Sequence, residues 1–394
     1  MEPIISTPYY LYEEKIILEQ INKIANAKIL KKNIHFSLMS NNNICLLNIL
    51  KESGLGVFTS SVQELAIAKK AGFDNKKIIF CSSNLKIDEI KEVINVNPVI
   101  IADSFNQLNK YLENGSLKEI GIRISFEPEF YRKNNFLEIQ RQGIEVDQLG
   151  QAIELCERHG VKIVGIHSYF GTNNSNEEFF KTGLSKLIDV STQFKDLEFI
   201  DGSGGFGLDY SNEKFNFNLN ELVRSFNDVL SGYPQLSGSI ELKIEPGRFI
   251  MGPAGKLICT VTEVYEKQGR IFIGVDTNLS QFPRPYIYGE YHRIEVYKRI
   301  KKDKLKRPHT FIVGNSIKSD DFFAINIDFP KVEEGDQLCF NYAGAYCYSL
   351  SSNFCGQLRP AEYLLSENNE YSEIRTPESF STLIKTQNPR SPGQ

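Results

Sequence analysis

The chain has 394 residues, of which 41% are hydrophobic and 24% charged, a composition typical of a globular protein long enough for two domains. A formal net charge of -4 excludes the strongly basic balance of proteins that bind nucleic acids. Runs of about eighteen apolar residues are absent and the N-terminus lacks the order of a signal peptide, so we expect a cytoplasmic protein without a membrane partner.

Cysteine and histidine spacing gives no support to a metal site. None of the seven cysteines forms a Cys-x-x-Cys pair, and the five histidines show no ligand spacing. We therefore expect reduced thiols and no bound metal.

Short apolar runs alternate with helical patterns through the first 250 residues. Residues 1–11 are predicted to be extended and to pair with a later β domain, and helical periodicity is clear at residues 44–53, 61–71 and 146–159. The runs predicted as strands are residues 35–38, 56–59, 77–81, 99–102, 121–125, 163–167, 197–200 and 241–244. Eight strands, each followed by a helix, predict a closed (β/α)8 barrel over residues 12–250, with a ligand site where the strands end.

The pattern changes after Arg248. Helical periodicity almost disappears, so residues 251–386 are predicted to form an antiparallel β domain, and residues 387–394 a disordered tail. The basic run at residues 298–307 is interpreted as the solvated tip of a hairpin. The predicted strands are residues 258–264, 270–275, 292–296, 310–313, 337–341 and 362–365.

A glycine-rich turn follows the seventh predicted strand, at residues 202–207. Glycines permit positive φ and allow successive backbone N–H groups to converge on an anion such as a phosphate. Alone, the turn fits a strand-to-helix connection without a ligand equally well. A second element that could bind an anion, Glu245-Pro-Gly-Arg248, lies about forty residues further on and favours the ligand.

These features together resemble the fold-type III pyridoxal-phosphate enzymes, in particular the group of diaminopimelate and ornithine decarboxylases. The resemblance runs nearly end to end and implies a TIM barrel followed by an antiparallel β domain, an amino-acid substrate, and a homodimer with shared active sites. The matching segments are residues 7–12, 61–65, 165–172, 202–207, 245–248, 284–288, 291–292, 335–336, 343–346 and 359–362.

The resemblance also implies roles for individual residues. Glu245 would face the pyridine nitrogen of the cofactor, and Tyr169 would offer a flat face where ornithine decarboxylases place a histidine. The phosphate would be held by backbone amides of Ser203, Gly204 and Gly205, the guanidinium of Arg248, and the hydroxyls of Thr172 and Tyr346. The remaining implied positions are Arg123 and His167 near the ring, and Arg284 and Tyr288 at the substrate.

Four positions depart from the family pattern. Met39 stands where the family has the lysine that bonds covalently to the cofactor, and a thioether cannot form that bond. Phe58 stands where an acid is common, and Ile317 replaces the catalytic cysteine of the loop at residues 314–321. Lys318 replaces an acid that meets the far amino group of the substrate, which predicts repulsion of a diamine and suits an acidic or neutral side chain.

Three hypotheses follow for the function. The chain could be a diverged relative that binds pyridoxal phosphate non-covalently, as a regulator or a dimer partner of an active paralogue. It could instead be an enzyme that uses a pre-formed cofactor adduct or pyridoxamine phosphate, or an ordinary decarboxylase whose lysine was replaced experimentally. Concerted change at Phe58, Ile317 and Lys318 favours natural divergence. The retained phosphate-binding residues favour a pocket that still accepts the cofactor, with decarboxylase activity lost or altered.

Overall fold

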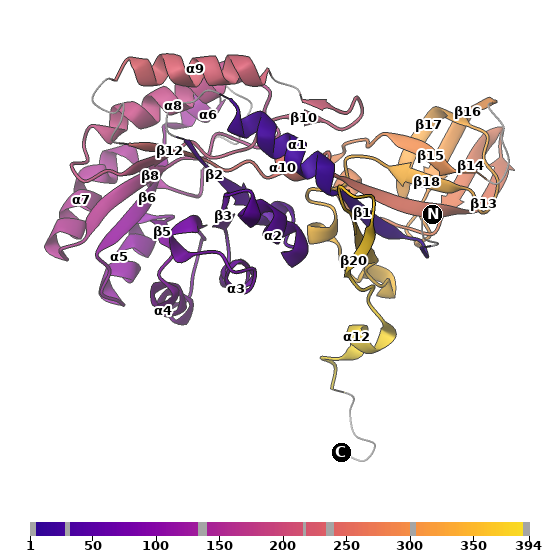
Figure 1. Cartoon of the computed structure of the whole chain (residues 1–394), viewed down its shortest axis with the longest axis horizontal. Helices are drawn as coiled ribbons and strands as arrows, with labels where there is room; N and C mark the ends of the chain where they lie inside the picture. Colours follow the sequence, from indigo (N-terminus) through magenta and orange to yellow (C-terminus); the bar gives the residue numbers. More distant parts are fainter. Residues whose placement is uncertain are drawn as a thin grey trace. The chain divides into compact units, whose positions relative to one another are not determined.

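The computed structural model describes residues 5–27, 32–132, 140–215, 218–233, 240–299 and 305–388. The chain divides into two compact units (Figure 1). The β unit contains Met1–Ile17, Asp209–Lys214 and Met251–Gln394, and the barrel unit contains Leu18–Leu208 and Phe215–Ile250. Residues 12–17 and 209–214, predicted to lie in the barrel, thus belong to the β unit. Tyr12 and Glu13 are the end of a strand in its sheet, and Tyr210 packs against His292.

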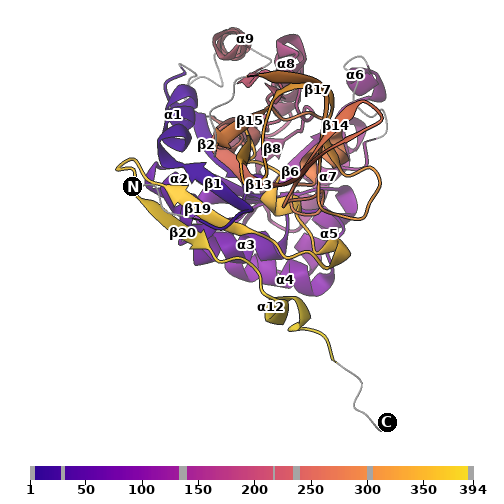
Figure 2. The same cartoon turned by 90° about the vertical axis from the view of Figure 1, so that its right-hand side faces the viewer.

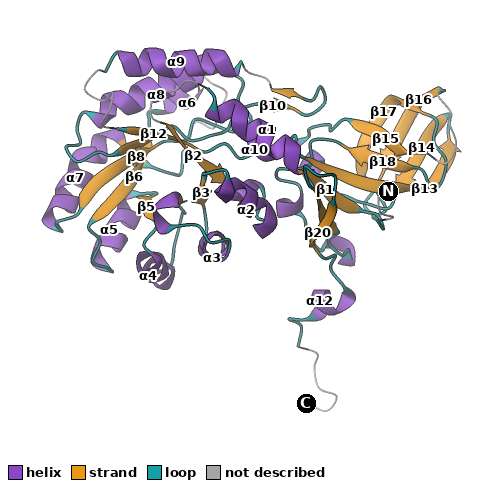
Figure 3. Cartoon of the chain, viewed as in Figure 1, coloured by secondary structure: helices purple, strands orange, loops and turns teal. Residues whose placement is uncertain are grey.

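The barrel unit is built on eight parallel strands, which confirms the predicted (β/α)8 barrel (Figure 3). Their order is β5-β4-β3-β2-β12-β9-β8-β6, and a pairing between β5 and β6 closes the ring. The strands are β2 (Lys32–Ser37), β3 (Gly56–Thr59), β4 (Ile78–Phe80), β5 (Val99–Ala102), β6 (Glu119–Ser125), β8 (Lys162–His167), β9 (Phe199–Asp201) and β12 (Glu241–Ile244).

Polar side chains fix where several barrel helices begin. Asn43, Ser61, Ser104 and Asn176 each accept a hydrogen bond from a backbone N–H of the first turn, which satisfies a donor that the helix itself leaves unpaired. The helices are α1 (Glu14–Ala25), α2 (Ile44–Glu52), α3 (Val62–Lys70), α4 (Ile87–Val96), α5 (Phe105–Glu113), α6 (Pro128–Arg132), α7 (Leu149–Arg158), α8 (Glu177–Ser191), α9 (Leu219–Ser231) and α10 (Arg248–Met251). Short strands β7 (Ile144–Glu145), β10 (Leu208–Asp209) and β11 (Lys214–Phe215) complete the connections.

Apolar side chains fill the middle of the barrel. A buried cluster brings Phe58, Ile79, Ile101 and Phe199 together from four different strands. Gly165 makes room for it, because a Cβ there would lie 1.9 Å from the Phe199 ring. This packed layer supports the inward-facing residues at the ends of the strands.

The β unit is a nine-stranded sheet in which most neighbours are antiparallel, as predicted. Two pairings are parallel, β1 with β19 and β14 with β16. Figure 2 shows β1 beside β19, with β20 on the other side of β19. The strands are β1 (Tyr9–Glu13), β13 (Gly255–Lys267), β14 (Arg270–Val275), β15 (Ile294–Lys298), β16 (Lys306–Val313), β17 (Phe322–Pro330), β18 (Gln337–Phe340), β19 (Ala361–Leu365) and β20 (Tyr371–Arg375); the helices are α11 (Arg284–Tyr288) and α12 (Phe380–Ile384).

The basic run at residues 298–307 does not join a hairpin, so that interpretation is wrong. Strand β15 pairs with β18, whereas β16 pairs with β14 and β17. Residues 300–304 of the run, and residues 389–394 of the predicted disordered tail, lie outside the described part of the chain. Within that part, no helix combines the length and apolar character needed to cross a membrane.

Candidate functional site

Three inward-facing residues meet at the carboxyl ends of the neighbouring strands β8, β9 and β12. His167 is the register partner of Asp201, and the N–H of Glu245 donates to the carbonyl of Ser203 at 2.9 Å. Because side chains alternate along a strand, His167, Asp201 and Glu245 all point to the inside of the barrel. We call these three residues the acid–histidine cluster.

The acid–histidine cluster is buried, and several of its polar atoms lack hydrogen-bond partners among the described residues. The Nε2 atom of His167 lies 3.5 Å from Oε1 of Glu245, and each of the three side chains has a polar atom without a hydrogen-bond partner among the described residues. Burial raises the pKa of both Asp201 and Glu245 to about 8, and burial lowers the pKa of His167 to about 4. At neutral pH these pKa values keep both acids largely protonated, because the opposing effect of the Arg123 guanidinium on the pKa of Glu245 is smaller than that of burial.

The glycine-rich turn after β9 is shaped by its close contacts. Ser203 and Gly205 have positive φ, of 60° and 85°. A Cβ at Gly204 would lie 2.1 Å from the carbonyl oxygen of Glu245, and one at Gly205 would lie 1.8 Å from that of Gly171. Only glycine therefore fits at the last two positions without moving the loops after β8 and β12.

Two amides of this turn are available to a ligand. The Ser203 N–H already donates to Oδ1 of Asp201 at 2.8 Å, so the prediction that it would also hold the phosphate is not supported. Gly204 and Gly205, in contrast, donate to no acceptor within the described residues. Their amides are the donors that an anion would use.

Arg248 and Thr172 add side-chain donors beside this turn, since a Cβ at Gly205 would lie 3.6 Å from Thr172 Cα. Arg248 opens α10 and is 6% exposed, and its Nη2 donates to Oγ1 of Thr172 at 3.3 Å. Gly247 lets the loop after β12 approach β2, because a Cβ there would lie 2.9 Å from the Ser40 hydroxyl. A guanidinium, a hydroxyl and two amides on one set of neighbouring loops fit the chemistry of a phosphate monoester.

Arg123, on β6, has a buried counter-ion that the sequence did not predict. Its Nη1 lies 3.2 Å from Oδ1 of Asp103, which follows β5, and the two side chains are 12% and 5% exposed. The guanidinium also lies 5.8 Å from the centre of the Tyr169 ring. Asp103 accepts a second hydrogen bond, from the Ser83 hydroxyl at 2.5 Å, so it positions Arg123 toward the ring of Tyr169.

Strands β2 and β3 end in apolar side chains at the same end of the barrel, where the carboxyl ends of the strands lie. Met39 lies in a 3₁₀ turn, Leu38–Ser40, and is 39% exposed. Phe58 is 7% exposed and lies parallel to His167, with ring centroids 6.0 Å apart. Neither position offers a nucleophile or a proton-transferring group.

The predicted substrate residues lie in the β unit. Arg284 is 1% exposed, pairs with Glu290, and its Nη1 lies 3.0 Å from Nε2 of His292. Its guanidinium carbon is 3.5 Å from the centre of the Tyr210 ring. These contacts hold the Arg284 side chain within the β unit. Because the side chain is buried, its exposure gives no support to the predicted role in binding the substrate. Tyr288 is 47% exposed, and Tyr346 is half-buried with a φ of 58°.

The loop at residues 314–321 presents its two substituted positions differently. Ile317 is 96% exposed. Lys318 forms an ion pair with Asp320, and its ammonium lies 4.7 Å from the centre of the Tyr286 ring. Because Asp320 balances the lysine, the charge reversal at this position does not by itself predict repulsion of a diamine.

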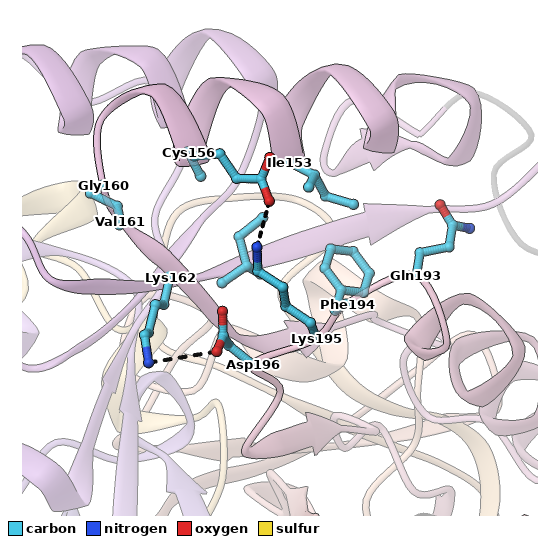
Figure 4. A pocket seen from close by; sticks show the side chains of 11 residues that line it. Ile153, Cys156, Gly160, Val161, Lys162, Gln193, Phe194, Lys195 and Asp196 are labelled. Carbon is cyan, nitrogen blue, oxygen red and sulfur yellow. Dashed lines mark hydrogen bonds and ion pairs between the residues drawn. The ribbon is translucent and has the colours of Figure 1, made fainter.

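A hollow of about 530 Å³ lies at the opposite end of β8 (Figure 4). The hollow is lined by residues from the end of α7 and the start of β8. Its lining residues form two ion pairs, Lys162 with Asp196 at 3.5 Å and Lys195 with Glu157 at 2.7 Å. The hollow contains none of the predicted site residues. Barrel chemistry is located at the carboxyl ends of strands, so we do not assign the hollow a catalytic role.

Comparison with known proteins agrees with the barrel fold. The profile described as pyridoxal-dependent decarboxylase, pyridoxal binding domain, matches residues 14–252. The chain belongs to the pyridoxal-dependent decarboxylases. It is 30% identical to the diaminopimelate decarboxylase of Methanothermobacter thermautotrophicus over 97% of this chain and 92% of that protein.

Two further relatives indicate the range of this family. The crystal structure of diaminopimelate decarboxylase from Helicobacter pylori complexed with L-lysine has a TM-score of 0.86 and 25% identity, covering 97% of this chain and 96% of that one. The L-glutamyl-[BtrI acyl-carrier protein] decarboxylase of Niallia circulans is 26% identical over 97% of this chain and 94% of that protein. The family thus includes proteins named for different amino-acid substrates.

Sequence reasoning missed two buried acids of the site. Asp201 immediately precedes the glycine-rich turn, where an acid is easily interpreted as a turn residue. Asp103 follows the apolar run of β5. In both cases the available signal was an acid at the carboxyl end of a predicted barrel strand, a position that faces the site.

Proposed function

We propose that this decarboxylase-family protein binds pyridoxal phosphate or pyridoxamine phosphate without a covalent bond, and that its decarboxylase activity is lost or altered. One observation carries the proposal. Among the described residues, the amides of Gly204 and Gly205 and one oxygen of Glu245 have no hydrogen-bond partner, and the turn after β2 carries Met39 instead of an amine.

Each retained contact has a separate task in this proposal. Gly204, Gly205, Arg248 and Thr172 hold the phosphate, and Glu245 accepts a hydrogen bond from the protonated pyridine nitrogen. When bound, pyridoxal phosphate supplies the electron sink that decarboxylation of an amino acid needs. Charge-assisted contacts worth about 1.5 to 3 kcal/mol each support an affinity on the order of micromolar without a covalent anchor.

The proposal is tested with purified protein freed of cofactor. Calorimetric titration should show saturable binding of pyridoxal phosphate and of pyridoxamine phosphate. Borohydride treatment of the equimolar complex should leave the protein mass unchanged, whereas an active diaminopimelate decarboxylase handled in parallel gains the mass of a pyridoxyl group. No heat with either compound would overturn the proposal, and a stoichiometric mass gain would overturn the non-covalent mode.

The enzymatic alternative needs its own measurement. A pre-formed cofactor–amino acid adduct requires no amine from Met39, so the residues that hold the phosphate would serve it equally well. Release of carbon dioxide from such adducts of lysine, ornithine, glutamate or diaminopimelate would establish turnover. Binding without release would favour a regulatory role.

We also propose that the protein assembles as a homodimer, or as a heterodimer with an active paralogue. The β unit exposes apolar side chains on α11 and on the neighbouring loop: Tyr286, Ile287 and Tyr288 are 47–53% exposed and Ile317 is 96% exposed. Lys318 links the two segments through its contact with Tyr286. Exposed apolar side chains on neighbouring segments are typical of an interface.

A further inference from the structure

The acid–histidine cluster has an arrangement of donor atoms that the proposed cofactor uses only in part. Glu245 would face the pyridine nitrogen, but Asp201 and His167 have no task in holding the phosphate. His167 is 1% exposed and Asp201 is fully buried, and neither ring nitrogen of His167 nor Oδ2 of Asp201 has a hydrogen-bond partner among the described residues. Polar atoms buried in this way are costly unless a ligand satisfies them.

We propose that the cofactor-free protein binds a divalent transition-metal ion through His167, Asp201 and Glu245. One imidazole and two carboxylates form a donor set suited to Zn²⁺, Co²⁺ or Mn²⁺. One donor atom from each residue lies within 4.8 Å of the other two, and His167 Nε2 is already 3.5 Å from Glu245 Oε1. Metal–ligand bonds of about 2.0–2.2 Å in tetrahedral geometry require about 3.4 Å between donors, so small side-chain movements complete the site.

Neighbouring groups compensate the acids of the cluster only in part. Arg123 is paired with Asp103 at 3.2 Å, and although its guanidinium lowers the pKa of Glu245, burial outweighs that effect and raises this pKa to about 8. Ser203 supports both acids from one side, its N–H donating to Asp201 at 2.8 Å and its hydroxyl to Glu245 at 3.5 Å. Asp201 and Glu245 also share a side-chain hydrogen bond, which requires a proton on one of them. A divalent ion would replace that proton and bind one oxygen of each carboxylate.

Metal and cofactor would compete for Glu245. This part of the inference rests on the proposed function, because a protonated pyridine nitrogen and a metal ion would both require Oε1 of the same carboxylate. The metal-bound protein would then be a form that excludes the cofactor, and the cofactor would displace the ion.

The test is a titration of chelator-treated, cofactor-free protein with Co²⁺, followed by visible d–d absorption and equilibrium dialysis. One ion per chain is expected. Asp201→Asn, Glu245→Gln and His167→Asn should each weaken binding by at least the roughly 10- to 100-fold typical of lost supporting contacts at metal sites. Cys355→Ser, which removes the exposed thiol, should bind as the unsubstituted protein does. Circular dichroism shows whether each variant is folded. If a variant fails to fold, Co²⁺ binding by the folded unsubstituted protein still shows whether the metal site exists.

The outcomes separate this inference from the proposed function. Absence of bound Co²⁺, or binding that survives both Asp201→Asn and Glu245→Gln, overturns the metal site. Displacement of Co²⁺ by pyridoxal phosphate supports competition. Binding of both ligands at once would retain the metal site and overturn the placement of the pyridine nitrogen at Glu245.

Discussion

Met39 and Glu245 stand at the ends of the paired strands β2 and β12, and the character of the site follows from the difference between them. Glu245 retains a buried oxygen that has no hydrogen-bond partner among the described residues, whereas Met39 supplies neither charge nor nucleophile. In the proposed function, this one side chain would separate reversible binding of a cofactor from covalent attachment.

Met39→Lys should restore covalent attachment of pyridoxal phosphate. Lysine and methionine have similar length, and the side chain is 39% exposed at the end of its strand, so an amine is accommodated. Borohydride reduction should then add one pyridoxyl group, seen by mass spectrometry. Turnover of diaminopimelate or ornithine should stay about 100-fold or more below that of an active relative, because Ile317 offers no proton-transferring group.

Met39→Gln is the matched control for length without an amine, and it should remain unlabelled. Rapid decarboxylation by Met39→Lys alone would contradict the prediction. It would indicate that the lysine was the only function missing from an otherwise intact active site.

Gly205→Ala should weaken binding of pyridoxal phosphate at least tenfold, on the order of 1.4 kcal/mol. The added methyl group would lie 1.8 Å from the Gly171 carbonyl oxygen and would displace the turn that presents the two free amides. Gly54→Ala is a close control, since Gly54 has a φ of 82° against 85° at Gly205 and no atom within 4 Å of the added group. Both changes carry the roughly 1 kcal/mol cost of left-handed backbone, so calorimetry should find a large affinity difference between them.

Protein freed of metal and cofactor should lose stability as the pH rises from 6.5 to 8. Burial raises the pKa of Asp201 and Glu245 to about 8, so these acids are protonated in the folded state and ionised in the unfolded state across that window. Stability therefore falls with increasing pH, by about 1.4 kcal/mol per pH unit for each acid near pH 6.5 and by about half as much at pH 8. Below pH 6.5 the trend is opposed by His167, whose pKa burial lowers to about 4.

Thermal unfolding across this pH range measures the effect. Asp201→Asn should flatten the slope. Asp209→Asn is the control: hydrogen bonds from Asn212 and Ser211 lower the pKa of Asp209 to about 2, so it stays ionised throughout. A slope that Asp201→Asn leaves unchanged would contradict the assignment.

The loop at residues 314–321 is organised around one buried carboxylate, that of Asp321. Asp321 is 4% exposed and accepts hydrogen bonds from the Ser316 amide at 3.1 Å, the Ser316 hydroxyl at 2.6 Å and the Leu279 amide at 3.0 Å. A Cβ at Gly314 would lie 2.3 Å from its carboxylate. The loop is therefore built around Asp321, while Ile317 at its tip is free to vary.

Asp321→Ala should destabilise the β unit by about 2 kcal/mol, because three hydrogen bonds are lost and the Leu279 amide is left without an acceptor. Tryptic cleavage after Lys318 should become several-fold faster in parallel. Asp320→Ala removes an exposed ion pair to Lys318 and a hydrogen bond from Tyr286 at the surface, and it should change thermal stability little. Equal losses of stability from the two substitutions would contradict this account.

The elements of the barrel could be predicted more fully than those of the β unit. Strands β3, β5 and β12 have their predicted bounds, because short apolar runs between amphipathic helices are local signals. Strands β17 and β20 were not predicted, and the neighbours of β15 were wrong. Which strands pair in the β unit depends on contacts distant in sequence, and no local pattern records them.

The same limit applies to the site. The glycine turn and Arg248 were predicted from motifs, whereas the buried pairing of Arg123 with Asp103 and the approach of Asp201 to Glu245 arise only when the ring of strands closes. The partners of Lys318 and Arg284 also depended on neighbours that the sequence pattern did not reveal.

At the scale of the whole molecule, the chain should form a dimer at micromolar concentration, and pyridoxal phosphate should strengthen it if the ligand binds the assembled form more tightly. Sedimentation velocity with and without ligand is the measurement. Ile287→Asp places a charge in the exposed apolar surface of α11 and should dissociate the dimer, whereas Glu157→Gln, at the far end of β8, should not. A monomer under all conditions would contradict the prediction.

Strand β1 lies between β13 and β19 in the sheet. It is synthesised early, but one of its two neighbours is among the last strands to be made. Its parallel neighbour, Ala361–Leu365, is made some 350 residues later. During synthesis, residues 9–13 must remain unpaired on one side until the chain is nearly complete. A nascent chain halted before residue 361 would have a completed barrel sequence and an open strand edge, a state exposed to chaperones and to aggregation.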